Sequence, residues 1–249
     1  MKNNKKGFYL LILTGLIVII ALLLAKPILQ DEAYHTFSDE STILGIPNFW
    51  NVLSNLPFIL VTIYGFLKVI RWVDQKWMYQ ILLLGIALVG LGSGYYHWGP
   101  TSTTLIWDRL PMTITFMSLF SIIISEFVSK KWGTNLFIPF IILGLSTILY
   151  WIYSPSGDLR PYVLVQFYPM IAIPIILIFF KKNNQMTSGY WLLIGAYVIA
   201  KLCEHFDTNI HQYLVVMSGH SLKHIFAAIG LYLFLKSQYE WKRILKKTN

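Results

Sequence analysis

Apolar runs long enough to cross a lipid bilayer recur along this chain, with only short polar breaks between them. A hydrocarbon core of about 30 Å needs roughly 20 helical residues for each crossing. We expect eight such segments, near residues 8–25, 48–70, 78–98, 104–128, 135–153, 161–180, 189–206 and 213–235. The composition agrees, since 56% of the 249 residues are hydrophobic and only 12% are charged, outside the range of ordinary soluble domains. The chain is therefore predicted to be a multi-pass membrane protein without a separate soluble domain.

The segments are predicted to be helices, because only helices and closed barrels satisfy the backbone hydrogen bonds in lipid. The runs also lack the two-residue alternation of a membrane strand. Residues 1–30 are expected to form an uncleaved first helix resembling a signal anchor, because their apolar stretch is longer than the core of a usual signal peptide. The other seven segments, within residues 31–249, are expected to form the main helical bundle of an all-α membrane protein.

The formal net charge of +9 follows from topology. With eight crossings and a cytoplasmic N-terminus, most of the 20 Lys and Arg residues fall on the inner side, including those at both Lys-rich ends, as the positive-inside rule expects. We therefore expect a cell-membrane location, cytoplasmic N- and C-termini, and no nucleic acid partner. The single cysteine, Cys203, excludes an intrachain disulfide and a thiolate metal cluster.

Few ionisable side chains lie within the predicted spans. Each costs several kcal/mol in hydrocarbon by insertion scales and is therefore a functional candidate. They are His97, Asp108, Arg109, Lys201, Glu204, His205, His220, Lys223 and His224, with Ser93 and Asn51 as polar companions.

The histidines among them have the spacing of a metal site. His220 and His224 stand four residues apart, which places both imidazoles on one face of a helix. Ser93 and His97 share that spacing on another segment, and the expected topology brings all these groups, with Asp108, toward the outer side. Three histidines and an open position are the ligand set of a catalytic zinc site. Asp108 would hold or deprotonate a water at the open position, and Ser93 would hydrogen-bond to that water or to a substrate carbonyl.

Structural interpretations of the same residues stay open. His220 and His224 could simply bond to neighbouring helices. Ser93 lies beside three glycines and could belong to a small-residue face that lets two helices approach closely. These glycines are Gly90, Gly92 and Gly94.

A second polar group, in the stretch KLCEHFD, offers a rival site with Glu204, His205 and Asp207. Lys201 and Glu204 stand three residues apart and are expected to form an ion pair instead. His205 is expected at the membrane interface. Lys223 either pairs with Glu204 or extends to the surface.

Four stretches of the sequence resemble, in order, the signatures of the alkaline ceramidase family. They are FWNVLSNLPF (49–58), GSGYYH (92–97), WDRLPM (107–112) and GHSLKH (219–224). This family is part of a superfamily of seven-helix membrane hydrolases that also contains the adiponectin-receptor-like proteins. The resemblance runs from about residue 39 to about residue 240 and covers most of the chain.

The resemblance implies a seven-helix bundle with a zinc ion held by His97, His220 and His224 at the outer helix ends. Ser93 and Asp108 would then lie around the zinc-bound water. The implied reaction is hydrolysis of the amide of ceramide to a sphingoid base and a fatty acid, with the substrate drawn from the bilayer. We therefore expect a zinc-dependent membrane amidohydrolase of sphingolipid metabolism, acting on ceramide or a related N-acyl lipid.

Two departures from the family pattern affect this expectation. Animal members carry a calcium site built on an Asp-Trp-x-Glu-x-Asn stretch and a Glu just before Phe-Trp-Asn. Here Asn48 occupies that last position and the Asp-Trp-x-Glu stretch is absent, which puts calcium binding in doubt. The extra first helix leaves the site on the outer face, and the short loops look bacterial, so that face would be periplasmic or extracellular. Because many bacteria make no sphingolipids, the natural N-acyl lipid stays open.

Two other classes of protein compete with a hydrolase. An adiponectin-receptor-like signalling protein would use its zinc structurally. A transporter is less favoured, because the chain shows no convincing internal repeat and the inner halves of its spans are nearly free of ionisable groups. The sequence predicts neither the acyl-chain length nor the oligomeric state.

Overall fold

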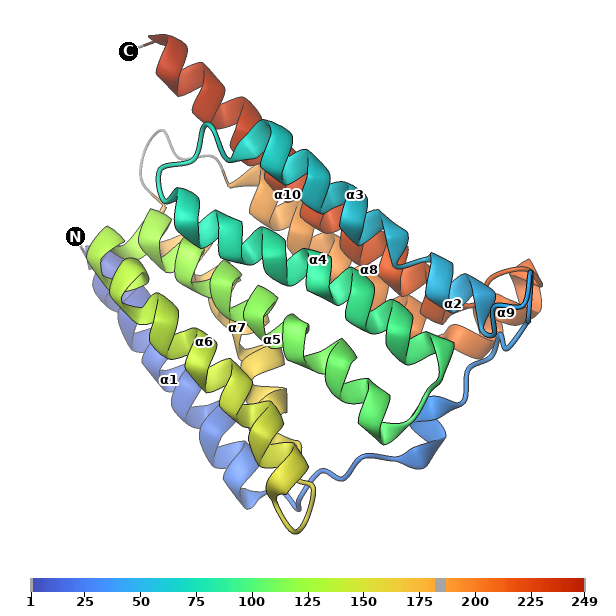
Figure 1. Cartoon of the computed structure of the whole chain (residues 1–249). Helices are drawn as coiled ribbons and strands as arrows, with labels where there is room; N and C mark the ends of the chain where they lie inside the picture. Colours follow the sequence, from blue (N-terminus) through green and yellow to red (C-terminus); the bar gives the residue numbers. More distant parts are fainter. Residues whose placement is uncertain (1, 182–186, 249) are drawn as a thin grey trace. The chain divides into compact units, whose positions relative to one another are not determined.

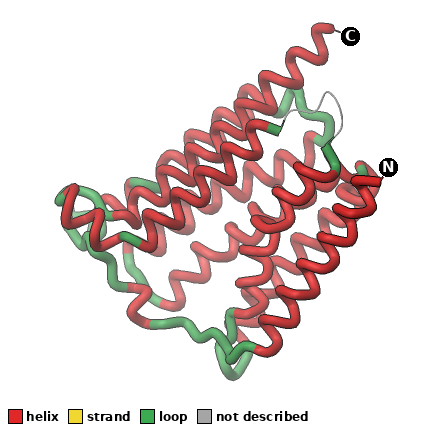
Figure 2. Tube along the Cα trace, turned by 180° about the vertical axis from the view of Figure 1, so that it is seen from behind, coloured by secondary structure: helices red, strands yellow, loops and turns green. Residues whose placement is uncertain are grey.

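The computed structural model describes residues 2–181 and 187–248, which are almost entirely helical (Figure 1). In chain order the elements are α1 (Lys2–Leu24), η1 (Glu32–His35), α2 (Phe49–Leu53), α3 (Leu56–Tyr64), η2 (Gly65–Val69), α4 (Lys76–Trp98), α5 (Ser102–Ile123), η3 (Ile124–Val128), α6 (Lys130–Tyr153), α7 (Arg160–Phe179), α8 (Ser188–His205), α9 (Asp207–Leu214) and α10 (Gly219–Thr248). No strand occurs among the described residues (Figure 2). The predicted all-α membrane fold is confirmed.

Helices occur at all eight expected positions, but they differ in apolar character. Among the described residues, six helical segments are long and apolar enough to span a membrane, or seven if the bent pair α9–α10 is one span. Helix α8 is not among them, because Lys201, Glu204 and His205 lower the hydropathy of its last turns. The eight-crossing topology stays a prediction.

The chain divides into two compact units, the first of which comprises residues 1–31 and 112–187. In this unit α1 packs along α7, and α6 packs against both α7 and η3. The loop before α7 fastens α1, because the Asp158 carboxylate accepts hydrogen bonds from the backbone N–H of Ile28 at 3.2 Å and from Nε of Arg160 at 2.8 Å. The Arg160 guanidinium also donates to the Ala25 carbonyl at 2.7 Å. These bonds hold the end of α1 at the start of α7.

The second unit comprises residues 32–111 and 188–249 and contains every candidate site residue. Helices α8 and α10 run side by side (Figure 1), and α3 packs against α10 and α4. At two places in this unit, a glycine lets neighbouring backbone segments come close together. A Cβ on Gly92 would lie 2.0 Å from the Trp107 carbonyl oxygen, and one on Gly219 would lie 2.1 Å from that of Cys203. The small-residue interpretation is thus confirmed for Gly92.

Helices α9 and α10 meet at an angle of 101°. Val215, just after α9, has a φ of 61°, a conformation that β-branched residues rarely adopt and that ends the helix there. The segment expected over 213–235 is therefore wrong at its start, because α10 begins only at Gly219. Hydropathy did not reveal this turn, since the turn itself, residues 213–217, is apolar.

Candidate metal centre

Three buried histidines meet in the second unit. His97 lies on the last turn of α4, and His220 and His224 lie on the first turns of α10. Their side chains are almost inaccessible, at 1%, 7% and 6% exposure. One ligand nitrogen from each ring lies within 4.8 Å of the others, and the Nε2 atoms of His97 and His220 are 3.4 Å apart. The cluster could therefore bind a metal ion.

The Ser54 hydroxyl lies against Nδ1 of His224. The Ser54 hydroxyl donates its single hydrogen to the Asn51 carbonyl at 3.1 Å, and its oxygen lies 2.9 Å from Nδ1 of His224. With its hydrogen on the Asn51 carbonyl, the Ser54 oxygen is free to accept from Nδ1–H. The lone pair of His224 is then on Nε2, as a metal ligand requires.

Asn51 links the helices around the imidazoles. Its side-chain oxygen accepts from the Ser221 hydroxyl at 2.7 Å, and its side-chain nitrogen donates to the Asp39 carbonyl at 3.1 Å. Its own carbonyl accepts from Ser54 and, at 2.8 Å, from the Asn55 amide. A completely buried asparagine thus joins α2 and α10 to the loop that precedes α2.

His97 is held through its backbone and by an aromatic contact. The Asn48 side-chain amide donates to the His97 carbonyl at 2.9 Å. The Phe37 ring lies edge-on to both His97 and His220, with centroids 4.8 Å away in each case. Nδ1 of His97 is buried and has no hydrogen-bond partner among the described residues. A buried set of imidazole nitrogens, with so few protein partners of its own, suits a cation such as zinc.

Asp207 fixes the start of α10. One carboxylate oxygen accepts from the backbone N–H of His220 at 2.6 Å, and the other from the backbone N–H of Ser38 at 3.2 Å. The carboxylate is therefore engaged by two amides, and the rival site of Glu204, His205 and Asp207 does not form. Within the described part of the chain, only the three-histidine group has the geometry of a metal site.

Ser93 and Asp108 lie next to each other beside this centre. Ser93 is buried on α4, one turn before His97, and Asp108 is half-buried on α5. The Ser93 hydroxyl donates a hydrogen bond to the Asp108 carboxylate, and the charges of Lys223, Arg109 and Glu204 act on that carboxylate. The structure thus pairs these two residues, and their catalytic roles belong to the proposal below.

The expected ion pair of Lys201 with Glu204 is confirmed. The alternative left open for Lys223 is decided in favour of pairing, because its Nζ lies 2.7 Å from Oε1 of Glu204. One carboxylate therefore joins two ammonium groups at the contact of α8 and α10.

Sequence reasoning missed the residues that hold the imidazoles in place. Ser54, Ser221 and Phe37 are ordinary residue types, and no spacing singles them out. Ser54 lies inside the FWNVLSNLPF stretch, and Ser221 inside GHSLKH. Their positions in these two stretches were the only signal available.

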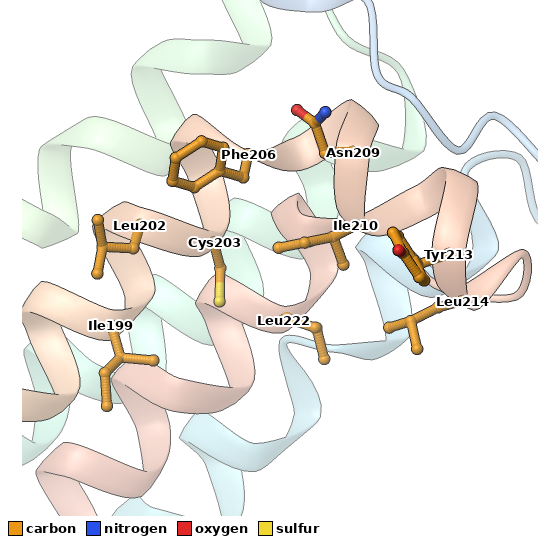
Figure 3. A pocket seen from close by; sticks show the side chains of 9 residues that line it. All are labelled: Ile199, Leu202, Cys203, Phe206, Asn209, Ile210, Tyr213, Leu214 and Leu222. Carbon is orange, nitrogen blue, oxygen red and sulfur yellow. The ribbon is translucent and has the colours of Figure 1, made fainter.

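An apolar hollow of about 510 Å³ lies between α8, α9 and α10 (Figure 3). It is lined by Ile199, Leu202, Cys203, Phe206, Asn209, Ile210, Tyr213, Leu214 and Leu222. Leu222 is two residues from each histidine of α10 and so lies about 200° around the helix from both. The hollow is therefore on the other side of α10 from the imidazoles.

Comparison with known proteins identifies the family. The family model described as Ceramidase matches residues 42–248. The chain belongs to the ceramidase family. The comparison with curated proteins finds no match. Membership of this family makes the chain an amide-bond hydrolase acting on ceramide, and it does not favour the receptor alternative.

Proposed function

We propose that this ceramidase is a zinc-dependent hydrolase, with His97, His220 and His224 as metal ligands. It would cleave the amide of ceramide or a related N-acyl lipid to a free amine and a fatty acid. The convergence of three buried imidazoles in a ceramidase-family chain carries the proposal. Zinc bound there would supply Lewis acidity, which lowers the pKa of water and polarises a carbonyl group.

Asp108 and Ser93 would handle the proton and the developing charge. Asp108 would take the proton of the attacking water and pass it to the leaving amine, the work of a general base and then a general acid. Once Asp108 has taken up the proton, the Ser93 hydroxyl would turn its single hydrogen from that carboxylate to the oxyanion that forms on the amide carbonyl. Their contact supports this assignment, because it places a donor and a carboxylate side by side.

The surrounding hydrogen bonds would keep the ligands in position. Ser54 would accept from Nδ1–H of His224 and so keep its Nε2 free for the metal, and Asp207 holds the first turn of α10 through the His220 amide. Such partners orient metal-bound imidazoles and raise their basicity.

Topology and domain boundaries form part of the proposal. Residues 1–30 would be the anchoring helix and residues 31–249 the hydrolase bundle, with both termini cytoplasmic and the site toward the outer face. Calcium binding is not part of the proposal, because the Asp-Trp-x-Glu stretch is absent and Asn48 stands where animal members have a Glu.

The direct test compares metal content and turnover in matched variants. Purified protein should contain one zinc per chain and release fatty acid from a fluorescent ceramide. His220→Ala should lose both the metal and the activity, because two imidazoles hold zinc weakly. His205→Ala, which changes an exposed histidine of α8 outside the cluster, should keep both. Protein without stoichiometric metal, or His220→Ala with parental activity, would show the proposal to be wrong.

A chelator separates the hydrolase from a receptor-like protein. Removing the metal should abolish turnover and lower the thermal stability of the parental protein, but should not change the stability of His220→Ala. A structural zinc would instead give a loss of stability with no lipid turnover to lose.

A further inference from the structure

The apolar hollow between α8, α9 and α10 is a cavity outside the metal centre (Figure 3). Its volume is about 510 Å³. Typical ligand pockets measure ~300–1,000 Å³, and an apolar cavity of about 150 Å³ already holds a benzene molecule. Leu222 lines the hollow from the face of α10 opposite His220 and His224. The hollow is therefore large enough for a ligand of its own, separate from the imidazoles.

The part of the lining that α8 contributes is a continuous apolar stripe. Ile199 and Cys203 on α8, and Phe206 just after it, follow at spacings of four and three residues, so they share one face over about 10 Å of helix. Cys203 is 8% exposed and forms the floor, whereas Ile199 and Phe206 are 43% and 47% exposed and stand at the rim. The rim continues the exposed apolar surface of α8, to which Val198 also belongs. The hollow is therefore open on the side that faces the surrounding bilayer.

Helix α9 closes one end of the hollow and has little protein to pack against. It meets α10 at 101°, and none of its eight residues is buried. Ile210 and Leu214, four residues apart, line the hollow from one face of α9, and Tyr213 beside them is 92% exposed. The side chains of the lining that carry nitrogen or oxygen are Asn209 and Tyr213, and both belong to α9. The lining is therefore apolar toward α8 and carries its polar groups at α9.

This arrangement matches a lipid better than water or a second protein. Water finds few hydrogen-bonding partners in an apolar lining. A protein partner would first have to displace the bilayer lipids that cover the exposed apolar surface of α8 in a membrane protein. The hydrocarbon chain of a lipid corresponds to the stripe of α8, and its head group corresponds to the polar groups of α9. A short amphipathic helix of this kind suits a membrane interface.

We propose that the hollow binds one acyl chain of a bilayer lipid, with the lipid head group beside α9. The chain completes the packing of α9 by covering Ile210 and Leu214. Asp207, the first residue of α9, accepts a hydrogen bond from the backbone N–H of His220 at 2.6 Å, so a lipid that holds α9 in place also holds the first turn of α10. The site depends neither on a bound metal nor on the hydrolysis proposed above.

Photolabelling tests the site in the full chain. The parental protein in neutral detergent micelles is titrated with a phosphatidylcholine that carries a diazirine in one acyl chain, and labelled peptides are identified by mass spectrometry. Labelling of residues 199–206 and 210–214 should saturate. At low lipid it should exceed labelling of residues 138–149, which include exposed apolar side chains of α6, by about 10-fold, the preference expected from burying about two more methylene groups. Excess unlabelled phosphatidylcholine should remove this difference.

Two phenylalanine variants provide the contrast. Cys203→Phe puts a ring into the floor of the hollow and should abolish the saturable labelling. Val198→Phe puts the same ring on a neighbouring exposed position of α8 outside the lining and should leave the labelling unchanged. Cys203 is the only cysteine of the chain, so its reaction with a neutral thiol reagent reports on the hollow without any substitution. Added phosphatidylcholine should slow that reaction about 10-fold.

Hydrogen exchange tests whether the chain supports α9. Added lipid should slow amide exchange of residues 207–214 and 219–224 in the parental protein and in Val198→Phe, but not in Cys203→Phe, where the ring already takes the place of the chain. The proposal is overturned if labelling of the hollow rises in proportion to the lipid without saturating, or if lipid slows exchange equally in all three proteins, as a general coating of the surface would. Thiol protection that depends on protein concentration but not on lipid would instead assign the hollow to a second copy of the chain.

Discussion

Replacing Ser54 by alanine tests whether the hydrogen bond to His224 prepares the metal centre. Ser54 is 5% exposed, and its oxygen lies 2.9 Å from Nδ1 of His224. The variant leaves that N–H buried without its acceptor, at a cost of about 1–3 kcal/mol. It also frees the imidazole to rotate, and loss of such a partner typically weakens metal binding by about 10–100-fold.

Zinc affinity is measured by competition with a chromophoric chelator. Ser54→Ala should bind zinc about 10–100-fold more weakly than the parental protein, and excess zinc should restore much of the turnover, since His97, His220 and His224 all remain. In thermal unfolding, the substitution Ser54→Ala should lower the stability of the zinc-loaded protein more than that of the chelator-treated protein. That difference arises because the hydrogen bond stabilises the ligating orientation in particular.

Ser118→Ala serves as the matched control. Ser118 is completely buried on α5, and its hydroxyl has no hydrogen-bond partner among the described residues. Removing the same atom there should leave zinc affinity unchanged and stability equal or higher. If Ser54→Ala binds zinc as tightly as the parental protein, the orientation of His224 does not depend on this bond and the reasoning is refuted.

Two further variants test packing and charge. Gly92→Ala puts a Cβ against the Trp107 carbonyl, so thermal melts should show a free energy of unfolding lower by about 1–3 kcal/mol. The variant should also lower turnover, because it displaces the aspartate that follows Trp107. Gly94→Ala, whose nearest atom outside its own helix is 4.0 Å away, should do neither, and equal effects of the two would contradict this account. Burial raises the pKa of Asp158, but hydrogen bonds, chiefly from Arg160, outweigh it and hold that pKa below its usual value. The resulting stability is present above about pH 4 and is lost as the pH falls through the lowered pKa. In thermal melts across pH, Asp158→Asn should therefore be less stable than the parental protein at neutral pH and equally stable in strong acid. A difference in stability that persists in strong acid would contradict the prediction.

Much of the candidate site was predictable, because ionisable residues are rare in apolar segments. The spacing of His220 and His224 and the isolation of His97 were enough to suggest one metal centre, and the structure brings these three rings together. The pairing of Lys201 with Glu204 also followed from local spacing. These features depend on helix geometry within one segment, or on the high cost of a polar group in lipid.

The supporting hydrogen bonds were not predictable, because their partners are distant in sequence. Ser54 and His224 are separated by 170 positions, and so are Asn51 and Ser221. Whether their side chains meet depends on the rotation of α2 and α10 about their own axes. Hydropathy carries no information on that rotation.

The sequence by itself determined that this is an all-α membrane protein with buried histidines suited to a metal, because hydrophobic length and helical spacing are properties of single segments. Only the tertiary structure decided where α10 begins, that Ser54 lies against Nδ1 of His224, and that Lys223 shares Glu204 with Lys201. The physical reason is that these outcomes depend on which atoms of separate helices come within hydrogen-bonding distance, and packing alone sets those distances.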